Sequence, residues 1–133
     1  MAINAASHLI DRHLHENRAG KTAFVDGHGV HTYAALARMV NQAGHALCRL
    51  GVRRGDRVIV CLHDSLSFPA IFFGALKIGA IPVPLNTLLT PEDYSFVLSD
   101  SGAVAAVVST PLMERLEPAL NSNIENALVM IEG

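Results

Sequence analysis

Apolar residues in the middle of the chain recur with two patterns that alternate along the sequence. Short continuous apolar runs are typical of buried strands, and the stretches between them carry apolar residues at helical spacing. Parallel neighbouring strands need a crossover between them, so the alternation predicts an open, mostly parallel α/β sheet with helices on both faces. The predicted strands are 57–62, 80–84, 103–109 and 128–131, and the predicted helices are 65–78, 91–98 and a short one from Pro111 that is broken near Pro118.

Two further helices are predicted ahead of this sheet. Asn4 is a suitable cap for a short first helix, which carries Leu9, Ile10 and Leu14 on one side. Thr32 is a suitable cap for a long amphipathic helix. The apolar positions of the long helix are Leu36, Val40, Ala43, Leu47 and Leu50, and its polar face carries Arg38, Asn41, Gln42, His45 and Arg49.

A small β-hairpin is predicted between these two helices. Residues 22–26 and 30–32 are short extended pieces separated by Gly27 and Gly29. Glycine supplies the positive φ that tight turns require, so this spacing favours two antiparallel strands. The N-terminal part of the chain should therefore run helix, hairpin, helix before the sheet begins.

The predicted helix from Leu66 to Leu76 is apolar on every side. A helix of this kind is buried all round, and a chain of this length covers one side more easily than both. We therefore expect more chain, a second subunit or another partner to cover the other side, with an ordinary small core as the alternative. Phe72, in the middle of this helix that connects two predicted strands, is expected to be buried in the core.

Composition narrows the class of protein. Of the 133 residues 50% are hydrophobic and 17% are charged, which predicts a folded chain that forms one domain or part of one. The formal charge of −2 argues against nucleic-acid binding, which needs a dense basic face. The start has no signal-peptide pattern and the longest apolar run is too short to cross a bilayer. A soluble, cytoplasmic protein that binds no membrane is expected.

Cysteine and histidine offer little chemistry. Cys48 and Cys61 have no CxxC spacing, and we expect both to be buried, reduced thiols. Among the seven histidines, His28 and His31 flank the predicted turn and could approach each other. No carboxylate or thiol pattern completes a metal site around them, so solvated histidines are the favoured interpretation.

Motifs for phosphate binding or nucleophilic catalysis are incomplete. The glycines of residues 51–56 precede a strand, whereas a P-loop needs its lysine and hydroxyl at the start of the helix that follows. Asp64 and Ser65 are expected to cap the apolar helix rather than to react. Residues 90–93 combine a cap, a proline and two acids, which is a strong helix start.

Parallel α/β sheets bind ligands beyond the carboxyl ends of their strands. In this sequence the segments at those ends are 63–65, 86–89 and 109–110. None of them is a glycine-rich anion cradle. The residues alone therefore indicate part of an α/β domain whose ligand cleft lies at these loops and whose active site is incomplete.

Three segments, taken in order, strongly resemble the opening of the adenylate-forming (AMP-dependent synthetase) ligases. They read Thr-Tyr-Ala-Ala-Leu at 32–36, Gly-Val-Arg-Arg-Gly-Asp-Arg-Val at 51–58 and Gly-Ala-Leu-Lys-Ile-Gly-Ala-Ile-Pro-Val-Pro-Leu-Asn at 74–86. Residues 86–90 and 4–14 look most like the benzoate-CoA ligase branch. The resemblance implies that residues 1–133 are a single partial α/β domain, the N-terminal segment of the large domain of such a ligase, without its C-terminal lid domain.

The resemblance also implies an activity for the parent protein. Such enzymes convert a carboxylic acid, aromatic or other, and ATP with Mg²⁺ into an acyl-adenylate and pyrophosphate, and then transfer the acyl group to coenzyme A. Their Ser/Thr/Gly-rich phosphate loop, magnesium-side acid and catalytic lysine have no counterpart here. The isolated chain is therefore expected to bind none of these cofactors, to be inactive and to self-associate.

The chain departs from the family at two positions. Ala35 stands where relatives often carry the glutamate of a capping box. Leu88 stands where some CoA-using relatives carry an arginine, so no catalytic residue is assigned, and Asn86 and Thr87 are named only as a cleft-facing loop that could contact a cofactor. A stand-alone α/β interaction or scaffold module derived from a ligase is the alternative to a ligase fragment.

Overall fold

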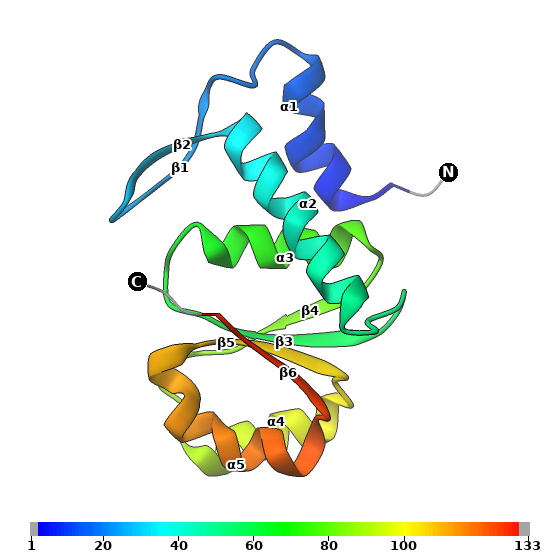
Figure 1. Ribbon diagram of the computed structural model, residues 1–133, viewed down its shortest axis with the longest axis vertical. Helices are drawn as coiled ribbons and strands as arrows, with labels where there is room; N and C mark the ends of the chain where they lie inside the picture. The colour runs from blue at the N-terminus through cyan, green and yellow to red at the C-terminus, as the bar shows by residue number, and fades with distance from the viewer. Residues whose placement is uncertain (1–2, 131–133) are drawn as a thin grey trace.

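The computed structural model describes the backbone of residues 3–130 as a layered α/β fold (Figure 1). A four-stranded sheet lies between one pair of helices, α2 and α3, and a second pair, α4 and α5. The short first helix and the β1–β2 hairpin lie beyond α2, at the far end from α4 and α5. The predicted fold class is confirmed.

All four strands of the sheet are parallel. Their order is β4 (Ile81–Pro84), β3 (Arg57–Cys61), β5 (Ala105–Ser109) and β6 (Asn126–Met130). The last strand starts two residues earlier than the pattern predicts, and Ile131 lies outside the described residues. The two central strands are the most buried part of the molecule, because alternate residues of each enter the cores on opposite faces of the sheet.

The hairpin and the cap of α2 form as predicted. Strand β1 (Thr22–Asp26) pairs antiparallel with β2 (Gly29–Thr32), and Gly29 adopts a φ of +126° at the turn. Helix α2 spans Tyr33–Arg49. The Thr32 hydroxyl accepts the N–H of Ala35 at 3.1 Å, which satisfies one of the free donors at the start of α2.

The first helix begins as expected, but its apolar side is only partly buried. The Asn4 Oδ1 accepts the N–H of Ala6 at 2.9 Å, and a π-helical turn, Ser7–Asp11, continues into α1 (Arg12–His15). Of the three expected apolar residues only Ile10 is buried; Leu9 and Leu14 are exposed. The first helix lies at the edge of the molecule and packs only one of its sides, around Ile10, against α2 and α3.

Helix α3 (Ser67–Lys77) lies between the sheet and α2. Ile71 and Ala75 face the sheet, while Ala70 packs in the cluster shared with α2. At the crossing with α2, a Cβ on Gly74 would lie 2.8 Å from the Cβ of Ala43. Helix α2 covers this second side, so the expectation that material outside the chain covers it is wrong there, and only half-buried side chains such as Phe72 leave part of α3 open.

Phe72 is not fully buried, which corrects a second expectation. Its side chain is half-buried and stacks on Phe68, with ring centroids 6.1 Å apart, and meets Phe73 edge-on at 5.4 Å. The sheet contact is made by Ile71 instead. Since successive helix residues point about 100° apart, a residue next to one that faces the sheet turns away from it.

Helix α5 differs from its prediction. It spans Met113–Asn123 and continues through Pro118, where a break is expected from sequence. Buried Leu116, Ala119 and Leu120 hold the helix on the sheet, and this burial offsets the hydrogen bond lost at the proline. Helix α4 (Pro91–Ser101) packs beside it and extends three residues beyond its predicted end.

The cysteines separate into two environments. Cys61 is buried in β3, as expected, but Cys48 is exposed, because it lies on the polar side of α2. Burial raises the pKa of the Cys61 thiol, so the thiol stays protonated. Within residues 3–130, no helix combines the length and the apolar character needed to cross a membrane.

Candidate functional site at the carboxyl edge of the sheet

The chain leaves the two central strands toward opposite faces of the sheet. After β3 it continues into α3 on one face, and after β5 into α5 on the other. Neighbouring strands whose connections diverge in this way leave a crevice at their carboxyl ends, where open α/β sheets bind ligands. The geometry therefore places the candidate site at the ends of β3 and β5, with the loop after β4 beside it.

One hydrogen bond joins the two loops that flank this crevice. The N–H of His63 donates to the Oγ of Ser109 at 3.0 Å, and Ser109 is fully buried. The side chains of His63 and Asp64 are exposed beside it. A buried hydroxyl that accepts a bond across the strand ends fixes the separation of the two loops.

The start of α3 is capped from a distance, not by Asp64 as expected. The Oδ2 of Asp26, in the hairpin, accepts the N–H of Leu66 at 3.0 Å. Ser65 contributes locally, since its Oγ accepts the N–H of Ser67 at 3.3 Å. The aspartate at this helix start is therefore supplied by β1, 40 positions earlier in the chain.

His31 is paired with the same aspartate, which corrects the expectation that it is a free, solvated histidine. Its Nε2 lies 2.9 Å from the Oδ1 of Asp26, and the Asp26 side chain is only 7% exposed. The hydrogen bond from His31, followed by that from Leu66, holds the pKa of the Asp26 carboxyl well below its usual range. No cluster of three potential metal ligands occurs in the part of the chain that the structure describes.

Asn86 and Thr87 lie in the loop that follows β4, at the expected edge. The Asn86 side chain closes a local turn, because its Oδ1 accepts the N–H of Leu88 at 2.8 Å. The carbonyl of Asn86 accepts the Tyr94 hydroxyl at 2.7 Å, and Arg115 Nη1 donates to the carbonyl of Thr87 at 3.3 Å. These bonds fix the backbone of the loop, and Leu88 projects from it, 81% exposed.

Tyr94 is the residue that ties this loop to the core. Its side chain is fully buried, and its hydroxyl also lies 3.7 Å from the Cys61 Sγ. Burial, followed by the bond to Cys61, raises the pKa of Tyr94 to about 12, so the phenol remains a hydrogen-bond donor to the loop at neutral pH. A pocket of about 420 Å³ opens near the loop and is lined by Pro91, Pro111, Glu114 and Arg115.

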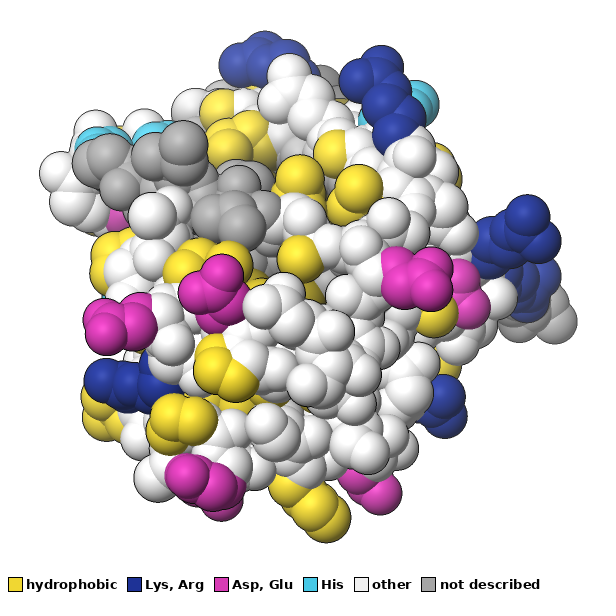
Figure 2. Space-filling view, turned by 60° about the horizontal axis from the view of Figure 1, so that its bottom comes forward, with side chains coloured by type: hydrophobic (Ala, Val, Ile, Leu, Met, Phe, Trp, Pro, Cys, Tyr) yellow, Lys and Arg dark blue, Asp and Glu magenta, His cyan; other side chains and the backbone are white. Residues whose placement is uncertain are grey.

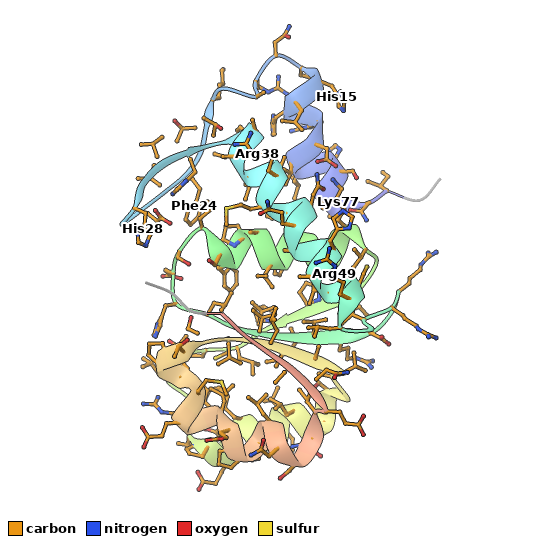
Figure 3. All side chains as sticks on the ribbon, viewed as in Figure 1. His15, Phe24, His28, Arg38, Arg49 and Lys77 are labelled. Atoms are coloured by element: carbon orange, nitrogen blue, oxygen red, sulfur yellow. The ribbon has the colours of Figure 1, made fainter. Side chains whose placement is uncertain are left out.

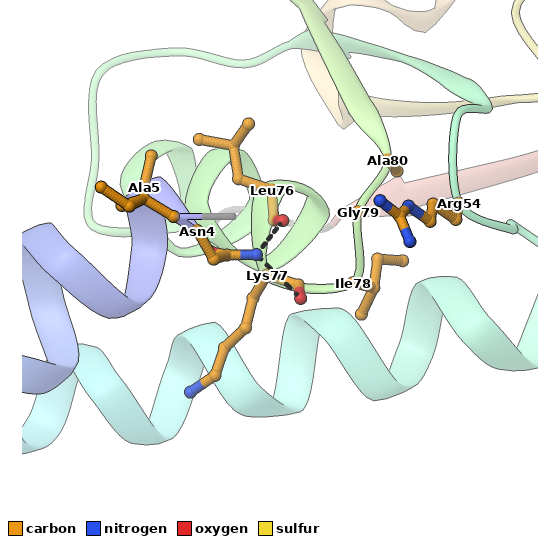
Figure 4. Close-up of a pocket in the computed structure, with 9 residues that line it drawn as sticks. Asn4, Ala5, Arg54, Leu76, Lys77, Ile78, Gly79 and Ala80 are labelled. Carbon is orange, nitrogen blue, oxygen red and sulfur yellow. Dashed lines mark hydrogen bonds between the residues drawn. The ribbon is translucent and has the colours of Figure 1, made fainter. Parts of the chain in front are cut away.

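A larger pocket, of about 550 Å³, lies at the opposite, amino edge of the sheet (Figure 4). The Asn4 Nδ2 in its wall donates to the carbonyls of Leu76 and Lys77 at 2.9 and 3.3 Å. Lys77 in turn contacts Asp11 at 2.8 Å and Asn41 at 2.7 Å. These groups bind the C-terminal end of α3, so we assign the residues around this pocket a structural role and do not take it as the candidate site.

Surface charge gives no sign of a polyanion site on the face that carries α4 and α5. In Figure 2, Lys and Arg side chains lie around the rim of this face, and its middle carries acidic and apolar side chains. This distribution agrees with the formal charge of −2.

The sequence does not identify two groups that shape the carboxyl edge, Asp26 and Tyr94; Ser109 falls in the predicted segment 109–110, but its bond to His63 is not predicted. Asp26 carries a local signal, since an aspartate before Gly-His-Gly is typical of a turn and its Oδ1 does accept the N–H of His28 at 2.9 Å. Nothing in the sequence connects it to Leu66. Tyr94 and Ser109 occur at ordinary helix and strand positions, so their roles follow only from the tertiary structure.

Comparison with known proteins identifies a family and several relatives. Residues 10–132 match the family described as AMP-binding enzyme. The chain is 48% identical over 118 residues to the benzoate–CoA ligase of Thauera aromatica, and 38% identical over 116 residues to a 4-hydroxybenzoate–CoA/benzoate–CoA ligase of Rhodopseudomonas palustris. These alignments cover 88% and 87% of this chain, but 22% of each relative.

Solved structures agree with these sequence matches. The benzoate CoA ligase from Burkholderia xenovorans LB400 superimposes with a TM-score of 0.87 at 36% identity, over 99% of this chain and 26% of that one. An anthranilate CoA ligase solved in complex with anthranoyl-AMP gives a TM-score of 0.87 at 34% identity, over 94% of this chain and 24% of its own. The 133 residues therefore span about a quarter of these structures.

Proposed function

The chain belongs to the family of AMP-binding enzymes, and from this premise we propose that it is the N-terminal segment of an AMP-forming aryl-CoA ligase. The parent protein would convert an aromatic carboxylic acid, ATP and coenzyme A into the acyl-CoA, AMP and pyrophosphate. The observation that carries the proposal is the 48% identity to a benzoate–CoA ligase over 88% of the chain.

The proposal assigns a supporting role to these residues. The described part of the chain has no cluster of ligands for Mg²⁺, and no segment of the sequence is a Ser/Thr/Gly-rich phosphate loop. Contacts to ATP, Mg²⁺ and coenzyme A would then come mainly from other segments of the parent. The carboxyl-edge loops, including Asn86 and Thr87, would form one wall of its cleft.

Pyrophosphate exchange tests the activity. We expect the purified 133-residue chain to incorporate no labelled pyrophosphate into ATP with benzoate or another acid, above a boiled-protein control. A complete ligase that contains this chain should show benzoate-dependent exchange and consume coenzyme A. Exchange by the short chain alone would contradict the assignment of the catalytic groups to other segments, and a complete protein without either activity would overturn the ligase proposal.

Self-association of the isolated chain is the second part of the proposal. Edge strand β4 carries Pro82 and Pro84, while the N–H groups of Ile81 and Leu85 bond inward, to the carbonyls of Asp56 just before β3 and Val60 within it. The alternate, outward positions of β4 therefore lack N–H donors, which blocks strand addition at that edge. Strand β6 is the other edge, and three half-buried phenylalanines, Phe68, Phe72 and Phe73, add apolar surface on α3.

Light scattering at high micromolar concentration tests this association. We expect a mass above that of the monomer, with a symmetric dimer through β6 or the phenylalanine surface of α3 as the simplest form. A sharp monomer mass would contradict it. The outcome also bears on the alternative, a stand-alone interaction module, because an inactive complete protein that binds a partner through this surface would favour the module.

A further inference from the structure

The hairpin contacts α2 and, through Phe24 and Asp26, also reaches the start of α3. Phe24 of β1 packs against the cluster that contains Leu66 and Ala70. Figure 3 shows Phe24 and His28 on the hairpin, with Phe24 toward the beginning of α3. The carboxylate of Asp26 bonds to Leu66 at the same place.

Asp26 is bonded on both oxygens. Its Oδ1 lies 2.9 Å from His31 Nε2 and 2.9 Å from the N–H of His28, and its Oδ2 accepts the N–H of Leu66 at 3.0 Å. A carboxylate with several donors makes charge-assisted bonds, and a negative charge at a helix N-terminus is favoured by the helix dipole. Helix α3 has no side-chain cap of its own at Leu66.

The same bond anchors the helix end of the loop between β3 and α3. At the strand end, the N–H of His63 is held by Ser109, and at the helix end the N–H of Leu66 is held by Asp26. Asp64 and Ser65 lie between these two bonds. The shape of the loop at the crevice therefore depends on a residue that lies outside the sheet altogether.

We propose that Asp26 is a positioning residue for the crevice: it caps α3 from the hairpin and thereby fixes the loop 63–66 beside the ends of β3 and β5. The role of this loop as a wall of a ligase cleft rests on the proposed function. The effect of Asp26 on the position of the loop does not depend on that function. The hairpin then stabilises the loop at the site through Asp26.

Amide hydrogen exchange in the 133-residue chain tests the coupling directly. In Asp26→Ala, exchange at the Leu66 amide should accelerate about ten- to a hundredfold relative to Val107 in central strand β5, the reference for global opening, because a charge-assisted bond is lost. Exchange at His63 should rise with it. Equal acceleration at Leu66 and Val107, or none, would overturn the proposal.

Two variants complete the experiment. Asp56→Ala is the matched control, because Asp56 accepts the N–H of Arg53 at 2.8 Å within a turn at the amino edge; it should leave the Leu66 to Val107 ratio unchanged. Asp26→Asn keeps an oxygen for Leu66 and should restore most of the protection. If Asp26→Ala does not fold, the ratio of Leu66 to Val107 exchange is measured in Asp26→Asn instead. This variant removes the charge of Asp26, so a ratio identical to that of the unmodified chain would show that the charge contributes nothing to the cap.

The outcomes separate the two proposals. Loss of Leu66 protection together with an inactive complete protein would leave the positioning role intact and remove the ligase assignment. Intact protection in Asp26→Ala together with a competent complete ligase would do the reverse. In such a ligase, Asp26→Ala should lower kcat/KM and Asp26→Asn should rescue it, whereas a purely global loss of stability would reduce the amount of active enzyme without changing KM.

Discussion

Helices α3 and α4 have the same length, eleven residues each, and each follows a strand of the same sheet, but their ends are held differently. Helix α4 carries its own signals: the Thr90 hydroxyl and the Asp93 carboxylate bond reciprocally to backbone N–H groups, and Gly102 ends the helix in the left-handed conformation. Helix α3 is capped by Asp26 at its start, and Asn4 binds the carbonyls at its end.

The difference reflects where each helix lies. Helix α4 is at the surface, so its ends can be satisfied by neighbouring residues and by water. Helix α3 is enclosed between the sheet and α2, so its free backbone groups must find protein partners. Those partners come from 40 and 72 positions away in the chain. The hairpin therefore binds the start of α3, and Asn4, at the beginning of the N-terminal helix, binds its end.

The largest expected effect tests whether the sheet-facing residues of α3 and α4 contribute equally to the free energy of unfolding. Ile71→Ala in α3 and Leu98→Ala in α4 remove fully buried side chains, and each should cost about 3–4 kcal/mol. Phe72→Ala, at the half-buried neighbour, should cost only about 1 kcal/mol. Chemical denaturation with unchanged m-values measures all three. A loss at Phe72 as large as that at Ile71 would mean that the phenylalanine cluster is part of the core.

The next effect concerns the glycines. In Gly74→Ala the new Cβ would lie 2.9 Å from the carbonyl oxygen of Val40, so we expect a loss of about 3 kcal/mol from forced separation of α2 and α3. In Gly102→Ala the Cβ meets open space but φ is +63°, so only about 1 kcal/mol of backbone strain is expected. Thermal unfolding compares the two. A reversed order would contradict the close crossing of α2 and α3.

The stability that the Asp26 carboxylate contributes by capping α3 should decrease at acid pH. The folded-state pKa of Asp26 is lowered, so its contribution to stability is fully present above the ordinary aspartate value and is lost as the pH falls through the folded value. The difference in melting temperature between the unmodified chain and Asp26→Asn should therefore be present at neutral pH and shrink below about pH 4. A difference that grows on acidification would reverse the sign of the assigned coupling.

The local cap of α4 gives the smallest effect of the series. Thr90→Ala should cost about 1 kcal/mol, the usual value for loss of a threonine cap. His28→Ala, whose side chain is exposed in the hairpin turn, should change stability by no more than about 0.5 kcal/mol and serves as the control. Urea denaturation resolves both. A loss at His28 equal to that at Thr90 would assign that ring a structural role.

Much of the fold is predictable because its signals are local or periodic. The strands at 57–61 and 105–109, the hairpin at Gly29 and the caps at Thr32 and Thr90 all follow from neighbouring residues. The errors have a common form. Pro118 stays within α5 because packing outweighs the local rule, and Phe72 turns away from the sheet because its neighbour Ile71 occupies that direction.

The candidate site divides in the same way. Asn86 and Thr87 are found from sequence, since any loop after a parallel strand lies at the carboxyl edge. The bonds that give the site its shape, from Asp26 to Leu66, from His63 to Ser109 and from Tyr94 to Asn86, join residues that the chain brings together only on folding. The periodicity of apolar residues and the turn residues act over a few positions, so they fix which helices and strands form and in what order. Which distant side chains satisfy a buried backbone group depends on what lies next to it in space, and that was decided only by the tertiary structure.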